Sequence, residues 1–223
     1  DTGEPLSGAK FEICAKEDIL TPAGSVRVPA GSKVSTIVTD EKGEGQSDSL
    51  YLGKYEIRET EQPSGYVLPE ETYEVELEYN GQETELLSAE VKITNKPVKV
   101  SLKKKEEGTE NGLKGVKFAV WEKETPEEET IYVTDKEGRI EIKYLSPGTY
   151  CVQERESIPG YLKDDTVWEF TVDGTGRIKG KESMEYEIEN KKTKIKDTEA
   201  FWKGSGEKEI YAGKEAVIAD TVS

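Results

Sequence analysis

The chain has 223 residues and carries 31 Lys and Arg against 47 Asp and Glu, which gives a formal net charge of -16 at pH 7. Such a charge repels nucleic acid and anionic lipid, so binding to DNA, RNA or a membrane surface is excluded as its main role. Because the chain has no histidine and only two cysteines, without metal-ligand spacing, we expect no disulfide framework, no metal or other cofactor and no enzyme activity.

Alternating apolar residues predict short β-strands through the first half of the chain. The alternation has the two-residue period of strands with one buried face, and clusters of Gly, Asp and Pro between the apolar groups indicate turns. A Pro- and Gly-rich stretch from Thr21 to Ser32 is an insertion between these strands. The apolar residues of the predicted strands are Phe11 and Ile13, then Tyr55 and Ile57, then Tyr73, Val75 and Leu77.

The second half begins with a predicted strand from Val98 to Lys104. Lys104 shares the phase of Val100 and Leu102, so its side chain is predicted to point inward with theirs. No segment has the period of an amphipathic helix. The other predicted strands of this half contain Phe118 and Val120, Ile140 and Ile142, Tyr150 and Val152, and Trp168, Phe170 and Val172.

The two halves are copies of one unit. The block Gly53 to Glu59 recurs as Gly148 to Glu154, 95 residues later, and three further blocks keep this offset, which excludes coincidence. They relate Thr39, Asp40 and Gly43 to Thr134, Asp135 and Gly138, Gly65-Tyr66 to Gly160-Tyr161, and Ile93 and Asn95 to Ile188 and Asn190. The block Leu6 to Phe11 matches Leu113 to Phe118 at an offset of 107, which places the insertion in the first unit.

The fold class is therefore predicted to be all-β, as two tandem antiparallel β-sandwiches of the immunoglobulin size class. We assign residues 1–96 to the first domain and 97–191 to the second. The short connection at Pro97 predicts a stiff junction. Residues 192–223 match neither unit and are expected to begin a truncated third domain.

Three blocks carry a resemblance to a known family: Pro5 to Phe11, Gly53 to Thr60, and Pro63 to Tyr66. Together with their copies in the second unit, they resemble the B-type repeat of collagen adhesins and the SpaA-like domains of Gram-positive pilins. The resemblance covers residues 1–191. It implies transthyretin-like or inverse immunoglobulin-type sandwiches in the stalk of an extracellular, cell-wall-anchored protein, with the anchor outside these residues and neighbouring domains as partners.

The resemblance also implies an internal isopeptide bond in the second domain. Many members of the family join a Lys to an Asn, and Lys104 stands where the family carries its reactive Lys. Glu154 is in phase with Tyr150 and Val152, and Asn190 with Ile188, so both point into the core. The bond would form between Lys104 and Asn190, with Glu154 as the proton shuttle. Burial favours the uncharged amine and the protonated carboxyl that such a reaction needs.

Two other interpretations of these three residues remain open. In the first, Lys104 and Glu154 form a buried hydrogen-bonded pair and Asn190 is an ordinary turn residue. In the second, all three side chains face solvent. The run Lys103-Lys104-Lys105 also departs from the family's Lys-x-Asp pattern, so the reactive lysine could be displaced by one residue. If Lys104 is the inward lysine, Lys103 and Lys105 are predicted to face water.

The first domain keeps the equivalent residues Glu59 and Asn95 but lacks a strand equivalent to Val98–Lys104, so its site is expected to be idle. Lys10 is out of phase with Phe11 and is a poor substitute. We expect either a chain shortened at this end or a strand supplied by the C-terminal tail, because an open sheet edge is normally covered.

The tail resembles the first strands of the VaFE-type repeat. Some of its members form a Thr-Gln ester crosslink, and Thr198 matches that Thr, although no Gln partner lies before Ser223. The favoured alternative is an unpaired flexible tail.

The predicted function is therefore a structural stalk segment of a surface adhesin or pilin. The alternative is an adhesin module that recognises a host protein or glycan through the loops at one end of a sandwich or through the insertion. Against this alternative, the insertion contains no aromatic residue. No nucleophile, base and oxyanion set for an enzyme is visible.

Overall fold

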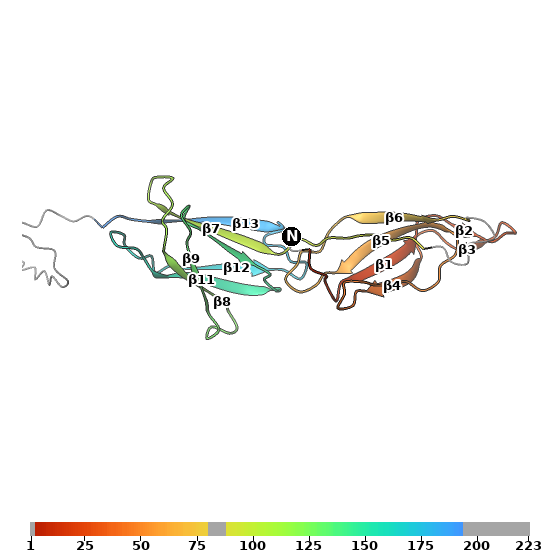
Figure 1. The fold of residues 1–223 in the computed structure, drawn as a ribbon, viewed down its shortest axis with the longest axis horizontal. Helices are drawn as coiled ribbons and strands as arrows, with labels where there is room; N and C mark the ends of the chain where they lie inside the picture. Colours follow the sequence, from red (N-terminus) through yellow and green to blue (C-terminus); the bar gives the residue numbers. More distant parts are fainter. Residues whose placement is uncertain (1–2, 80–87, 194–223) are drawn as a thin grey trace, which may run out of the picture. The chain divides into compact units, whose positions relative to one another are not determined.

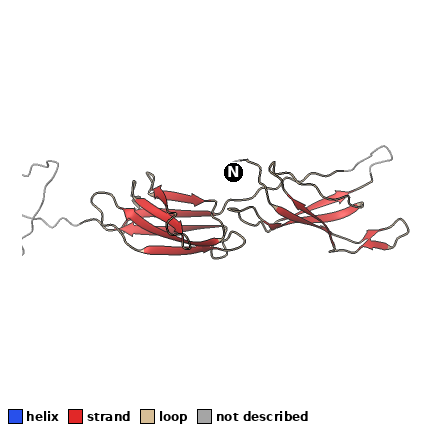
Figure 2. Ribbon diagram, turned by 90° about the horizontal axis from the view of Figure 1, so that it is seen from below, coloured by secondary structure: helices blue, strands red, loops and turns tan. Residues whose placement is uncertain are grey.

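In the computed structural model of the chain, residues 3–79 and 88–193 are described, and residues 1–192 form one compact unit. Over these ranges the chain forms strands and loops and no helix, as Figure 2 shows. The all-β prediction is confirmed. Within the same ranges, no helix could span a membrane.

The first domain is built on one antiparallel sheet with the strand order β4-β1-β5-β6 (Figure 1). Its strands are β1 (Lys10–Ala15), β4 (Lys33–Val38), β5 (Gly53–Glu61) and β6 (Thr72–Leu77). The insertion folds into a two-stranded hairpin of β2 (Ile19–Leu20) and β3 (Val26–Val28). Five residues, including Gly24, connect the two strands, and a connection of about three to five residues with a glycine favours such a hairpin.

The second domain is a sandwich of two sheets. One sheet has the order β12-β11-β8-β9 and matches the sheet of the first domain strand for strand. It contains β8 (Lys117–Glu122), β9 (Thr130–Val133), β11 (Gly148–Glu156) and β12 (Val167–Val172). The other sheet contains β10 (Arg139–Lys143), β7 (Lys99–Glu106) and β13 (Ser183–Asn190). In it β7 is the central strand, antiparallel to β10 and parallel to β13.

The core of the second domain lies between these two sheets. Its members are the inward residues that the two-residue period predicts, and several of them are almost completely buried. Val100 and Ile142 come from the β7 sheet, and Phe118, Val152 and Phe170 from the facing one. The core cluster of the first domain is smaller and consists of Ile13, Ala15, Ile19 and Tyr55.

The domains differ because no described strand of the first domain takes the position of β7. The segments that match β10 and β13 by the repeat, residues 44–48 and 88–95, are not strands. In the second domain β10 and β13 pair with β7 rather than with each other. In the first domain, without a strand between them, residues 44–48 and 88–95 have no strand to pair with.

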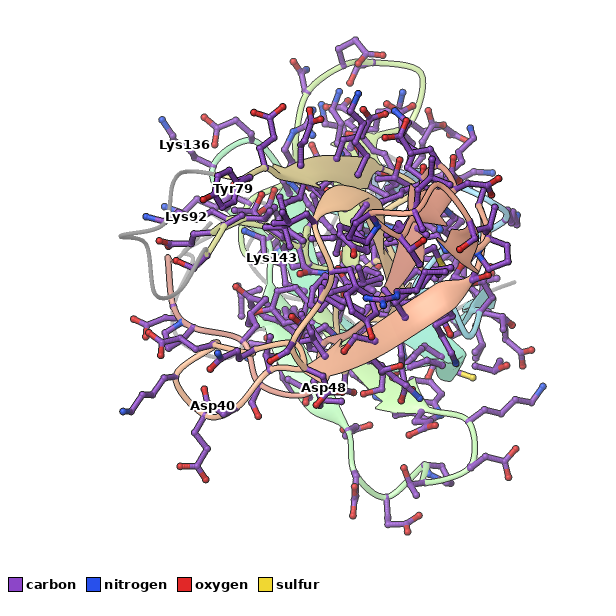
Figure 3. All side chains as sticks on the ribbon, turned by 90° about the vertical axis from the view of Figure 1, so that its right-hand side faces the viewer. Asp40, Asp48, Tyr79, Lys92, Lys136 and Lys143 are labelled. Atoms are coloured by element: carbon purple, nitrogen blue, oxygen red, sulfur yellow. The ribbon has the colours of Figure 1, made fainter. Side chains whose placement is uncertain are left out.

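Charged side chains cover the outer faces, and Figure 3 shows Asp40 and Lys136 projecting from the ribbon. Acidic and basic groups are interspersed, as in the pair of Arg139 with Glu185 at 2.7 Å. Such exposed pairs contribute about 0–1 kcal/mol each, so the stability of the fold rests on its cores.

Truncation of a core side chain tests this assignment. Ile142 is 0% exposed, and Ile142→Ala should destabilise the second domain by about 2–5 kcal/mol because it removes buried methyl groups and leaves a cavity. Ile131→Ala, at a position that is 47% exposed, is the matched control and should change stability by less than about 0.5 kcal/mol. Urea unfolding followed by tryptophan fluorescence measures both, since Trp121 and Trp168 lie in the second domain and the first has none. Equal effects of the two variants would contradict the assigned core.

Candidate functional site

Lys104 lies on the inward face of the central strand β7 in the second domain. Its side chain is 0% exposed, because both neighbouring strands and the facing sheet surround it. The ammonium nitrogen is 5.7 Å from the centre of the Phe118 ring and donates a hydrogen bond to the backbone oxygen of Glu189 at 3.4 Å. The two-residue period of β7 therefore places an amine within the apolar core.

The Glu154 carboxyl joins this amine to an amide. Glu154 lies on β11 in the facing sheet and is 0% exposed, and its Oε2 is 2.9 Å from Lys104 Nζ. Its other oxygen, Oε1, accepts a hydrogen bond of 2.8 Å from Asn190 Nδ2 on β13. The structure thus brings together the three residues that the sequence predicts for the site.

Burial controls the electrostatics of the amine. Removal from water lowers the pKa of Lys104 below its ordinary value, while the hydrogen bond and the charge of Glu154, with a smaller effect of Asp164, oppose that shift. A lowered pKa increases the fraction of neutral amine, which is the nucleophilic form.

The arrangement is suited to amide formation between two side chains. Glu154 contacts both groups that must exchange protons, the amine and the amide nitrogen. Asn190 Oδ1 is buried and has no hydrogen-bond partner among the described residues, so its carbonyl is not held by another donor. The set holds a nucleophile, an electrophilic carbon and a proton carrier away from water.

Ser157 is a contributor that the sequence did not reveal. Its Oγ accepts a second hydrogen bond from Asn190 Nδ2, at 3.0 Å. Ser157 follows the last residue of β11 directly, where the strand period no longer applies, so no pattern points to it. It helps to orient the Asn190 amide toward Glu154.

The prediction that Lys103 and Lys105 face water is wrong for Lys105, which is only 8% exposed, and Lys103 is also largely covered. Both point to the outer face of the β7 sheet, but β7 is its central strand. Carboxylates of β13 and of the loop after β7 therefore lie over them: Lys105 Nζ is 2.9 Å from Glu187 on β13 and 3.2 Å from Glu110 in that loop.

The first domain repeats half of this arrangement. Asn95 Nδ2 donates to Glu59 Oε1 at 2.8 Å, as Asn190 does to Glu154. Glu59 is 2% exposed, and its Oε2 has no hydrogen-bond partner in the part of the chain that the structure describes. Lys10 is half-buried on β1 and forms no ion pair with Glu59. Thr198, the predicted ester residue, lies outside the described residues.

Comparison with known proteins finds a family model that matches the chain twice. The family is SpaA, described as a prealbumin-like fold domain, and it matches residues 1–95 and 98–192. No curated protein matches the chain.

Several solved structures are similar. For the TIE protein of Bacillus anthracis the TM-score is 0.43 at 22% identity, over 86% of this chain and 32% of that one, so this chain spans about a third of its length. For GBS52, the minor pilin of Streptococcus agalactiae, the TM-score is 0.36 at 19% identity, over 88% of each chain. For the shaft pilin SpaA of Lactobacillus rhamnosus GG the TM-score is 0.36 at 16% identity, over 86% of this chain and 90% of that one.

The buried carboxyl of the first domain predicts a pH dependence. Burial raises the pKa of Glu59, while the hydrogen bond from Asn95 opposes the shift. A carboxyl with a higher pKa in the folded state stabilises the fold below its unfolded pKa, and that stabilisation is lost as the pH rises through the folded pKa. The protection of β5 amides against hydrogen exchange should therefore be greater near pH 5 than near pH 7.

Glu59→Gln should abolish this difference in protection, whereas Glu61→Gln, at the exposed end of the same strand, should retain it. Protection that is independent of pH in the unmodified chain would contradict a raised pKa for Glu59.

Proposed function

Because this chain belongs to the SpaA family of prealbumin-like fold domains, with two copies in tandem, we propose that it is a stalk segment of a Gram-positive surface adhesin or pilin. Its role is structural: it bears load between neighbouring domains of the same surface protein, outside the cell. No enzyme activity on a substrate is part of this role.

The proposal includes a covalent lock in the second domain. The neutral Lys104 amine attacks Cγ of Asn190, so that a C–N bond forms and the bond between Cγ and Nδ2 breaks. Glu154 accepts a proton from the amine and delivers one to the departing nitrogen, and one ammonia leaves. The reaction occurs once per chain, needs no cofactor and produces an amide between β7 and β13.

A single observation carries this proposal. One buried carboxyl contacts both reacting side chains, at 2.9 Å from Lys104 Nζ and 2.8 Å from Asn190 Nδ2. A buried Lys-Glu pair alone would account for the first distance. The Asn190 amide on the second oxygen is the additional partner that amide formation requires.

The position of the bond explains its mechanical use. Lys104 lies near the end of β7, the first strand of the domain, and Asn190 ends β13, the last one. These two strands are parallel neighbours, so an amide between them passes tension from β7 directly to the end of β13, where the chain leaves the domain. Tension would then pass through covalent bonds, and the chain between the two residues would not extend.

The intact mass of the denatured chain tests the lock. The unmodified chain should be lighter than its sequence mass by one ammonia. Glu154→Ala and the more conservative Glu154→Gln should have their full sequence masses, because the proton carrier is absent.

Glu59→Ala in the first domain is the matched control and should still lose one ammonia. Tryptophan fluorescence verifies that the second domain of each variant is folded. A full-mass unmodified chain would show that Lys104, Glu154 and Asn190 form only a buried polar cluster.

A second candidate function is ligand binding at the insertion, and one observation favours it. The Arg27 guanidinium of β3 lies over the Tyr51 ring at 4.4 Å, and Tyr51 is 53% exposed. The insertion contains no aromatic residue, but the fold brings this one to it. Leu20 and Val26, which pair across the hairpin, are also 56% and 50% exposed. Exposed apolar and aromatic groups of this kind are typical of recognition surfaces for proteins or glycans.

Surface plasmon resonance against arrayed host-matrix proteins and glycans tests this candidate. The unmodified chain should bind one of them saturably, and a Leu20→Ser, Val26→Ser double variant should lose that binding because its apolar contact area is removed. Val133→Ser changes a comparably exposed apolar residue of the second domain and should bind normally. Absence of saturable binding by the unmodified chain would leave the structural role as the sole function.

A further inference from the structure

A loop of the first domain contributes to the core of the second. Residues 62–68, here named the junction loop, directly follow β5. Val67 in this loop is 2% exposed and belongs to the core cluster of the second domain, together with Val98 and Ile142. Leu162 has the same place in the copied loop of the second domain, and it is 53% exposed. Val67 is therefore buried by the second domain and not by the loop to which it belongs.

Backbone hydrogen bonds tie the junction loop to two segments of the second domain. Val98 N, just before β7, donates to Gly65 O at 2.9 Å. Leu68 N donates to Thr175 O, in the connection between β12 and β13, also at 2.9 Å. The loop is thus held by the start of the second domain and by a turn that lies far away in the sequence.

The two domains approach too closely to leave room for side chains at two glycines. A Cβ at Gly65 would lie 2.9 Å from the backbone oxygen of Tyr144, and a Cβ at Gly176 would lie 2.4 Å from that of Tyr66. Gly160 is the counterpart of Gly65 and has nearly the same φ, 89° against 84°, but a Cβ there would meet nothing within 4 Å. Contact with the second domain, rather than the geometry of the turn, distinguishes Gly65.

Tyr144 has a strained backbone where it meets the junction loop. Its φ is 62°, a left-handed conformation that a residue with a bulky side chain adopts only where the surrounding contacts enforce it. Tyr144 N donates to Val98 O at 3.0 Å, and the Tyr144 ring lies 5.6 Å from the ring of Tyr66. Ser64 Oγ also lies 2.8 Å from Ser146 Oγ. These contacts keep the Tyr144 backbone in the position to which the loop is fitted.

We propose that the junction loop fixes the two domains relative to each other, with Val67 as its apolar anchor, and holds the start of β7 in place. Domains in one chain normally move relative to each other unless a packed apolar interface prevents it. An amide at Lys104 would not protect the residues of β7 that precede it, whereas the bond from Val98 to the loop acts there. This mechanical use rests on the proposed stalk role, but the coupling of the domains does not.

Gly65→Ala tests the coupling, and Gly160→Ala is the matched control. Both variants place a methyl group at a left-handed φ and bear similar backbone strain, but only Gly65→Ala clashes with the second domain. Amide exchange measured by NMR at Leu68 and Val98 should become about tenfold faster in Gly65→Ala, because the hydrogen bonds across the junction open. Exchange at both amides should be unchanged in Gly160→Ala.

Residual dipolar couplings measure the rigidity of the junction. In a weakly aligning medium, a single alignment tensor should fit the amides of both domains in the unmodified chain and in Gly160→Ala. Gly65→Ala and Val67→Ser should each need a separate tensor for each domain, whereas Leu162→Ser, at the exposed counterpart, should keep the single tensor. Amide exchange in β5 and β11 verifies that both domains of each variant remain folded.

Equal exchange in Gly65→Ala and Gly160→Ala, with a single tensor retained in both, would overturn the proposal. Separate tensors in the unmodified chain would also overturn it. The intact mass of the same samples reports the covalent lock independently. A full-mass unmodified chain with a single tensor refutes the lock and supports the coupling, and a chain that loses ammonia but needs two tensors does the reverse.

Discussion

The buried contact between Lys104 and Glu154 joins the two sheets in the core of the second domain, and the arrangement of the site depends on it. Removing both charges from water is expensive, and such a pair is tolerated only where its remaining hydrogen-bonding groups are also satisfied. Here the second carboxyl oxygen is held by Asn190, and the amine also reaches the backbone of Glu189. If Lys104 forms an amide with Asn190 and ammonia leaves, the ammonium charge is lost and the proton that it gives up remains on Glu154, so the reaction relieves the cost of burying both charges.

This contact needs β7 as the central strand of its sheet. An edge strand would leave the amine within reach of water, and water would keep it protonated and unreactive. With β10 on one side and β13 on the other, both edges of β7 are paired. The outward Lys105 shows the same effect, because it too is buried, beneath carboxylates. Central position in the sheet, rather than residue type, determines which lysines are covered.

The two domains are an internal comparison of what this strand contributes. They share the sheet made of β1, β4, β5 and β6 or their counterparts, and both hold an Asn-Glu hydrogen bond of 2.8 Å. Without a strand at the β7 position, the second sheet of the first domain does not form among the described residues, and its core is smaller. The carboxyl and amide are positioned by β5 and its surroundings, while the amine and the second sheet both depend on the one additional strand.

The sequence by itself determined the all-β class, the tandem repeat and the phase of Lys104, Glu154 and Asn190, because a two-residue period reports which side of its own strand a residue occupies. The equivalence of Glu59 and Asn95 followed from the repeat. Only the tertiary structure decided which strands are neighbours. It thereby decided the parallel contact of β7 with β13, the burial of Lys105, the placement of Tyr51 against Arg27 and the contact of Ser157 with Asn190. These features depend on contacts between segments far apart in the chain, and local periodicity contains no information about them.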